Sequence, residues 1–222
     1  MSITYPVVEK FISINGEGTK AGMLSAFIRM KGCNLRCNYC DTAWANEPDC
    51  TCDFLSLTEL LSWLGEADIK NVTLTGGEPL LTPDISLLID AIGKAGMEVE
   101  IETNGSVDLS PFAGLSCRPS FTMDYKCPDS GMESAMLLSN FSILNEKDTV
   151  KFVVSSMSDL DKAKEITEHY QLTTKCHVYL SAVFGRIEPK EIVSYMTDHH
   201  WNDVYLQLQM HKFIWPPQQR GV

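Results

Sequence analysis

Short runs of β-forming residues alternate with amphipathic helical patterns along almost the whole chain. Strands are predicted at residues 25–29, 72–75, 97–101, 121–123, 150–154, 177–180 and 204–208, and helices at 57–64, 85–95, 159–169 and 189–199. Such alternation favours an α/β fold with a parallel sheet and helices outside it. A closed eight-stranded barrel usually needs about 250 residues, whereas this chain has 222. About six βα units therefore predict a partial, splayed βα barrel in one domain, residues 1–222.

Two helix boundaries have local signals. Ser56 and Glu59 form an S-x-x-E capping box before an apolar helical repeat, and Gly96 is placed to end the helix that follows Asp84. The stretch 129–148 has no clean period and is expected to be a long loop with one helical piece.

The charge balance excludes several classes of partner. Lys and Arg number 18 and Asp and Glu 29, which gives a formal net charge of −11. An acidic surface argues against non-specific binding to nucleic acid or to anionic membrane. No apolar run approaches the roughly 20 residues of a membrane span, and residues 1–10 lack a signal-peptide pattern. We therefore expect a cytoplasmic protein.

Three of the eight cysteines lie close together. Cys33, Cys37 and Cys40 have the spacing C-x3-C-x2-C, directly after the strand predicted at 25–29. A reducing compartment makes a disulfide framework improbable. Structural zinc sites want four ligands, usually as two separated pairs, and no second pair of this kind follows. Three thiolates suit a 4Fe–4S cluster with one iron left open. Cys50 and Cys52 lie nearby, and their C-x-C spacing alone decides nothing.

Two further motifs end predicted strands. Thr75-Gly76-Gly77-Glu78-Pro79 follows the strand at 72–75, and Glu102-Thr103-Asn104-Gly105 follows the strand at 97–101. Paired glycines let a backbone approach a ligand closely, although each segment alone is also an ordinary turn.

The cysteine loop together with GGEP resembles the signature of the radical S-adenosylmethionine (SAM) superfamily. This resemblance implies a barrel of the radical SAM type, a 4Fe–4S cluster held by the three cysteines, and SAM bound to the open iron through its amino and carboxylate groups. One electron from the reduced cluster would then give a 5′-deoxyadenosyl radical that abstracts hydrogen from the substrate.

Further segments narrow the resemblance to the 7-carboxy-7-deazaguanine synthases, over about residues 7–215. They are Ile14-Asn15-Gly16-Glu17-Gly18, Phe27-Ile28-Arg29, the run GCNLRCNYCDT, and Gln209-Met210-His211-Lys212. The family is implied to convert 6-carboxy-5,6,7,8-tetrahydropterin into 7-carboxy-7-deazaguanine with release of ammonia, in queuosine and 7-deazapurine biosynthesis. The resemblance also implies a bound Mg²⁺, a homodimer, a flavodoxin- or ferredoxin-type electron donor, and substrate-binding segments at both ends of the domain.

The resemblance also implies roles for individual residues. Substrate contacts are expected from Ile14, Asn15, Gly16, Glu17, Arg29 and Thr75, and cofactor contacts from Tyr39, Asp41, Gly77, Glu78, Thr103 and Lys126. Glu17 would accept hydrogen bonds from the guanidine-like edge of the pterin, Arg29 would clamp its carboxylate, and Thr42 would ligate Mg²⁺. The radical itself is carried by the cofactor, so no catalytic side chain is assigned.

Three departures set this chain apart from the more familiar pattern. Asn15 replaces a Gln, the segment Asp124-Tyr125-Lys126 replaces Ser-Pro-Lys, and the chain continues through residues 213–222 beyond the usual end. The longer tail and the DYKCP segment resemble a clostridial-type branch of the family better. The terminal carboxylate therefore cannot be assumed to lie in the site.

Two other functions remain open at this point. An activase of a glycyl-radical enzyme shares the three-cysteine loop but acts on a partner protein, and a non-catalytic zinc- or cluster-binding module would not cleave SAM. Release of ammonia from the pterin would distinguish the synthase from both.

Overall fold

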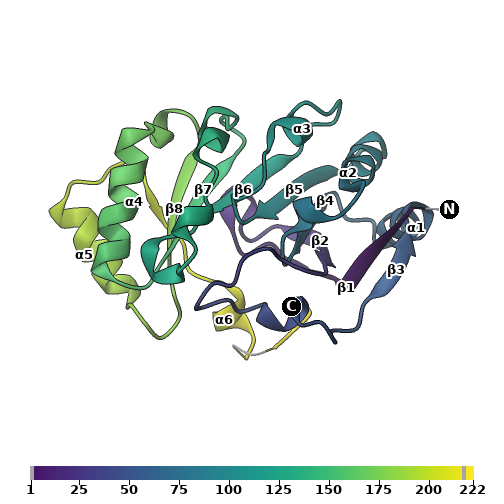
Figure 1. The fold of residues 1–222 in the computed structure, drawn as a ribbon, viewed down its shortest axis with the longest axis horizontal. Coiled ribbons are helices and arrows are strands. Elements are labelled where there is room, and N and C mark those ends of the chain that lie inside the picture. The colour runs from purple at the N-terminus through teal and green to yellow at the C-terminus, as the bar shows by residue number, and fades with distance from the viewer. Residues whose placement is uncertain (1–2, 217–218) are drawn as a thin grey trace.

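One open sheet of nine strands organises the chain (Figure 1). The computed structural model describes residues 3–216 and 219–222; the tail residues Pro217 and Gln218 lie outside the described part. The strand order is β3-β1-β2-β4-β5-β6-β7-β8-β9. Among the described residues the end strands β3 and β9 pair only with β1 and β8 and not with each other, so the sheet does not close. The expected partial barrel is confirmed.

Seven of the strands run parallel, and their ranges follow the predicted ones closely. They are β2 (Leu24–Met30), β4 (Asn71–Gly76), β5 (Glu98–Thr103), β6 (Ser120–Tyr125), β7 (Thr149–Val154), β8 (His177–Ala182) and β9 (Tyr205–Leu206). Most residues of β2 and β4 are buried, as expected for parallel strands covered on both faces. The register pairs Arg29 with Thr75 and Met30 with Gly76, which brings the cysteine loop beside GGEP.

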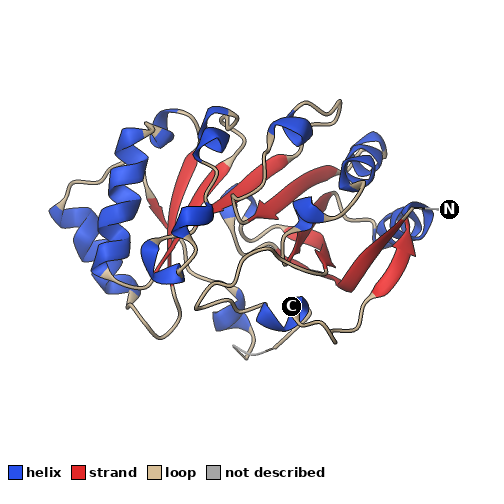
Figure 2. Cartoon of the chain, viewed as in Figure 1, coloured by secondary structure: helices blue, strands red, loops and turns tan. Residues whose placement is uncertain are grey.

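The longer helices lie along the outer side of the sheet, while the cysteine loop and the C-terminal segment lie on the other side (Figure 2). The helices are α1 (Leu57–Ala67), α2 (Ile85–Lys94), α3 (Ser110–Ala113), α4 (Met157–His169), α5 (Pro189–Asp198) and α6 (His211–Ile214). The Ser56–Glu59 capping box is formed in both directions. Gly96 follows α2 with a φ of +85°, as its predicted role at the helix end requires.

The sequence patterns missed two antiparallel strands at one edge. β1 (Thr4–Ile14) pairs with β2, and β3 (Asp53–Ser56) pairs with β1. The predicted parallel sheet therefore gains an antiparallel edge that the sequence patterns did not indicate. β1 mixes buried, half-buried and exposed residues and shifts register between Val7 and Glu9, so its alternation is interrupted. The segment 129–148 contains short 3-10 helices, including Leu138–Ser142, where one helical piece was expected.

The segment that follows β1 fills the inside of the barrel. Asn15 is fully buried, and its Nδ2 donates to Glu100 Oε2 at 2.5 Å. Gly18 has a φ of +61°, and a Cβ there would lie 2.7 Å from Thr122 Oγ1. Only glycine fits this turn, which Gln207 closes with hydrogen bonds to the backbone N–H and carbonyl of Gly18. Part of the I-N-G-E-G motif therefore serves the fold.

Across residues 3–216 and 219–222, none of the helices combines the length and apolar character needed to cross a membrane.

Candidate functional site

A cavity of about 560 Å³ opens at the carboxyl ends of the parallel strands. Fourteen of the sixteen predicted site residues line it: Ile14, Gly16, Glu17, Arg29, Cys33, Cys37, Tyr39, Cys40, Asp41, Thr42, Thr75, Gly77, Thr103 and Lys126. The carboxyl ends of strands are where α/β barrels place their functional residues. Segments that are far apart in the sequence thus meet in one place.

The three cysteines of the loop after β2 share this cavity. All three are free and half-buried. The Leu35 N–H donates to Cys33 Sγ at 3.4 Å, and Asn104 Nδ2 donates to the same atom at 3.5 Å. Among the described residues, no group of three or more His, Cys, Asp or Glu side chains is placed to hold a single metal ion. Cys50 and Cys52 do not line the cavity.

The GGEP segment packs tightly against the start of the cysteine loop. The Gly77 N–H donates to the Met30 carbonyl at 3.2 Å, and the Glu78 N–H donates to the Gly32 carbonyl at 2.8 Å. A Cβ on Gly77 would lie only 2.0 Å from the Gly32 oxygen. The second glycine is therefore required for this contact between the two loops.

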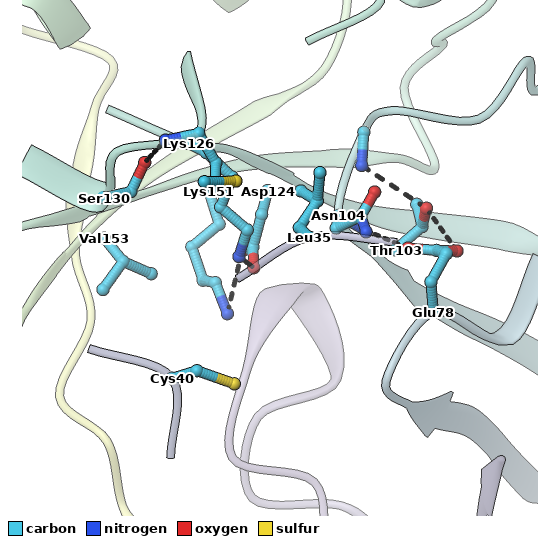
Figure 3. A network of polar contacts seen from close by, with 12 residues as sticks. Leu35, Cys40, Glu78, Thr103, Asn104, Asp124, Lys126, Ser130, Lys151 and Val153 are labelled. Atoms are coloured by element: carbon cyan, nitrogen blue, oxygen red, sulfur yellow. Dashed lines mark hydrogen bonds and ion pairs between the residues drawn. The ribbon is translucent and has the colours of Figure 1, made fainter. Parts of the chain in front are cut away.

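The Glu78 side chain is buried beneath the cavity and does not line it. Its carboxylate accepts hydrogen bonds from the Asn104 N–H at 2.6 Å, from Thr103 Oγ1 at 2.9 Å and from the Leu80 N–H at 3.1 Å. Figure 3 shows Glu78 facing Thr103 and Asn104. These contacts join the ends of β4 and β5. Asn15 is the other predicted residue that does not line the cavity: its Oδ1 accepts from the Glu17 N–H at 2.9 Å, and so it positions Glu17.

Burial raises the pKa of Glu78 to about 7, against three hydrogen bonds that favour the ionised form. Because the pKa is raised, the folded state holds this proton more tightly than the unfolded state does. The contribution of Glu78 to the free energy of unfolding should therefore fall as the pH rises from about 4.5 to 7. Glu78→Gln removes this titration. We expect the stability advantage of the wild type over the variant to shrink by about 3 kcal/mol across that range. Urea unfolding at pH 4.5, 6 and 8 measures it, and parallel pH profiles would contradict it.

A network of ion pairs forms the wall of the cavity on the side of β6 and β7. Lys151, on β7, pairs with Glu17 and with Asp124 Oδ1 at 3.1 Å, and Lys126 Nζ lies 2.5 Å from Asp124 Oδ2. Both lysine side chains converge on Asp124 in Figure 3, in which Cys40 is also drawn. Burial alone would raise the pKa of Asp124, but the two lysines hold it below its usual value. Burial alone would lower the pKa of Lys151, whereas Asp124 and Glu17 raise it well above normal. Sequence reasoning missed Lys151.

Glu102, beside this network, is a further acid of the cavity. Burial, and then the nearby Glu17 carboxylate, raise its pKa to about 8, while Lys151 and a hydrogen bond from Thr75 act in the opposite direction. Burial and the Glu17 carboxylate therefore both favour the protonated form of the Glu102 side chain.

An aromatic and cationic wall comes from β1 and β2. The rings of Phe11 and Phe27 stack with centroids 4.9 Å apart and line the cavity. Arg29 donates through Nε to Glu9 Oε1 at 2.7 Å, and its Nη groups take no part in this hydrogen bond. A flat apolar surface beside a fixed guanidinium suits a planar, carboxylated ligand. Predicting strand β1 and its pairing with β2 would have placed Phe11 beside Phe27.

The C-terminal segment contributes to the same cavity. His211, Gln219 and Arg220 line it together with Gly221 and Val222, and the Arg220 guanidinium lies over the Trp44 ring at 4.0 Å. Burial lowers the pKa of His211. The extended tail thus ends at the site even though it is longer than the familiar one.

Comparison with known proteins places this arrangement in a family. Residues 27–114 match the model of the radical SAM superfamily. A 7-carboxy-7-deazaguanine synthase from Clostridium acetobutylicum is 56% identical over 221 residues, which is 99% of this chain and all of that protein. One from Chlorobaculum tepidum is 35% identical over 97% of this chain and 96% of its own length.

A solved structure supports the fold. The crystal structure of QueE from Escherichia coli matches with a TM-score of 0.71 and 22% identity, and covers 92% of this chain and 93% of that one. The clostridial relative agrees with the resemblance to a clostridial-type branch. By its identity over the full length, the chain belongs to the 7-carboxy-7-deazaguanine synthase family of radical SAM enzymes.

Proposed function

We propose that this enzyme converts 6-carboxy-5,6,7,8-tetrahydropterin into 7-carboxy-7-deazaguanine with release of ammonia. The observation that supports this most directly is the 56% identity to a 7-carboxy-7-deazaguanine synthase over the full chain. The cavity adds a chemical argument, because it sets a guanidinium and stacked phenyl rings on one wall and buried carboxylates on the other.

The donor set fits the cofactors of the superfamily. Cys33, Cys37 and Cys40 are free thiols of one cavity, and we assign them to a 4Fe–4S cluster whose fourth iron takes SAM. The reduced cluster and SAM together would supply the radical that removes hydrogen from the substrate. Tyr39, Asp41, Gly77, Thr103 and Lys126 are the proposed cofactor contacts that line the cavity. Tyr39 is fixed there by its hydroxyl, which donates to the Val153 carbonyl at 3.0 Å.

The substrate is held between the two walls. Arg29 binds the pterin carboxylate, and Phe11 and Phe27 lie against its ring. Ile14, Gly16, Glu17 and Thr75 meet the pyrimidine edge, where Glu17 accepts hydrogen bonds from the amino group and ring N–H. We assign Asn15 and Glu78 to positioning roles, because both are buried and hold neighbouring segments in place.

Thr42 is the proposed Mg²⁺ ligand. It lines the cavity, its Oγ1 lies 3.6 Å from Cys40 Sγ, and its side chain does not cap the 3-10 helix Ala43–Asn46 that follows. The alternative role, a turn residue bonded to its own backbone, is therefore less well supported. Mg²⁺ prefers octahedral oxygen ligands and keeps several waters, so one hydroxyl with substrate oxygens and waters completes a site.

Magnesium should stimulate turnover by fixing the substrate. Thr42→Ala is expected to lower kcat/KM by about tenfold or more at saturating Mg²⁺, since a mispositioned substrate loses rate steeply. Thr42→Ser keeps the oxygen and should lose less, and cluster content should be unchanged in both variants. Product formation measured by mass spectrometry, with and without chelator, checks this. A wild-type rate that chelation leaves unchanged would contradict the role of the metal.

The wider assignments follow the family. We propose one domain over residues 1–222 with substrate-binding segments at both ends, a homodimer, a flavodoxin- or ferredoxin-type electron donor, and a cytoplasmic location. Eight free cysteines suit a reducing compartment. Light scattering of the reconstituted protein tests the dimer.

One experiment tests the function. The protein is reconstituted anaerobically with iron and sulfide and given the pterin, SAM, Mg²⁺ and dithionite. Mass-identified 7-carboxy-7-deazaguanine and an equal amount of ammonia support the assignment, whereas SAM cleavage without either product would overturn it.

A further inference from the structure

Asn104 is a buried residue of the cavity whose side chain faces the cysteine loop. It belongs to the E-T-N-G segment at the end of β5, is 6% exposed and lines the cavity. Its backbone N–H donates to Glu78 and so serves the fold. Its side chain takes no part in that contact and reaches the loop beside Leu35 (Figure 3).

The hydrogen bonds of this amide fix which of its atoms faces the loop. Oδ1 accepts from the Ser106 N–H at 2.9 Å and from Ser106 Oγ at 2.6 Å. Nδ2 donates to Asn34 Oδ1 at 3.0 Å and to Cys33 Sγ at 3.5 Å. An amide has two N–H donors and one acceptor oxygen, so every polar atom of the side chain is paired. Turning the amide over would set its NH₂ group against the Ser106 N–H. The donor side therefore faces Cys33.

Cys33 Sγ accepts two N–H groups, because the Leu35 N–H also donates to it, at 3.4 Å. Hydrogen bonds to the sulfurs are among the factors that set the reduction potential of an iron–sulfur cluster. Reduction adds one negative charge, and a donor stabilises the more negative form more strongly, so such bonds raise the potential. The Leu35 donor belongs to the backbone. The Asn104 donor is the one that a side-chain substitution can remove.

We propose that Asn104 is a positioning residue of the cluster, whose amide donates to the Cys33 sulfur and raises the potential at which the cluster accepts an electron. This inference rests on the cluster assignment of the proposed function. Partners that contact a ligand without binding the metal themselves tune a metal site in this way. A reductant of given strength would then keep more of the enzyme in the reduced form, which is the form that reacts with SAM.

The test is an anaerobic redox titration of the reconstituted protein, followed by electron paramagnetic resonance. SAM and substrate are left out, so that contacts with them do not contribute. Asn104→Ala should shift the one-electron equilibrium toward the oxidised cluster by about threefold or more, which lowers the midpoint potential by about 28 mV or more. Iron and sulfide content should match the wild type.

Ser106→Ala is the matched control in the same turn. It removes the Ser106 hydroxyl, but the Ser106 N–H still holds the Asn104 amide in place. Its equilibrium should stay within about 1.5-fold of wild type, which is about 10 mV. A shift as large as that of Asn104→Ala would show an effect of the turn rather than of the donor, and would overturn the proposal.

An unchanged or raised potential in Asn104→Ala would also overturn it. If Asn104→Ala does not retain its iron, Asn104→Ser decides, because its shorter side chain keeps an oxygen that can accept from the Ser106 N–H. A lowered potential in Asn104→Ser then supports the proposal, whereas an unchanged potential or loss of iron in this variant as well would assign Asn104 a structural role and overturn it. A wild-type protein that binds no cluster would instead refute the cofactor assignment itself.

Discussion

Cys37→Ala should abolish both the brown absorbance of the reconstituted protein and all product formation. Cys37 lies in the middle of the three thiols that line the cavity, and a 4Fe–4S cluster that already uses three protein ligands has no spare one. Cys33→Ala and Cys40→Ala should behave in the same way. Iron and sulfide content, the visible spectrum and mass-detected product measure the effect after anaerobic reconstitution.

Two other cysteines provide matched controls for this experiment. Cys117 is half-buried against Gly93, and Cys176 is buried with its Sγ 3.5 Å from the Leu172 carbonyl; neither lines the cavity. Cys117→Ala and Cys176→Ala should keep full cluster content and turnover, with at most a modest loss of stability from the small cavity each creates. A Cys37→Ala protein with a full cluster and wild-type activity would refute the ligand assignment.

The sequence predicted those parts of the fold and site that local patterns encode. The parallel strands and the four longer helices follow from hydrophobic period, and the capping box at Ser56 fixes a boundary to the residue. The motif residues at strand ends gather at one cavity, because parallel strands end on the same side. What a motif does not encode is the direction of each side chain. Asn15 and Glu78 belong to motifs, yet both point into the interior and hold their neighbours.

The missed site residues lie where long-range pairing decides the structure. β1 has a register shift beside Glu9, so its two-residue alternation is weak, and with β1 unpredicted the stack of Phe11 on Phe27 could not be expected. Lys151 lies inside a strand that reads as apolar, V-K-F-V-V. A lysine in such a run is a signal of its own, because a buried ammonium needs carboxylate partners. Those partners, Glu17 and Asp124, come from distant segments that the sequence does not bring together.

Lys151→Met should be the most destabilising single change in the cavity wall. The side chain is 8% exposed and its Nζ pairs with Glu17 and Asp124. Met keeps most of the volume but removes the charge, so two carboxylates lose their shared partner, although Lys126 still pairs with Asp124. Breaking a buried ion pair from one side typically costs about 3–5 kcal/mol. We expect a loss of that size in the free energy of unfolding at pH 7, measured by anaerobic urea titration of cluster-loaded protein.

The pH dependence of that loss separates charge from packing. In the variant, Asp124 loses one of the two lysines that hold its pKa below the usual value, so this pKa rises and the folded state takes up a proton more readily. The destabilisation should therefore shrink as the pH falls toward 5, where protonation relieves the uncompensated charge. Lys164→Met is the control: its Nζ pairs with Glu168 at 2.5 Å on α4, where the glutamate is 61% exposed, and such a pair contributes about 0.3–0.5 kcal/mol. A Lys151→Met loss no larger than this, or one that does not vary with pH, would show that the network is not what holds this wall together.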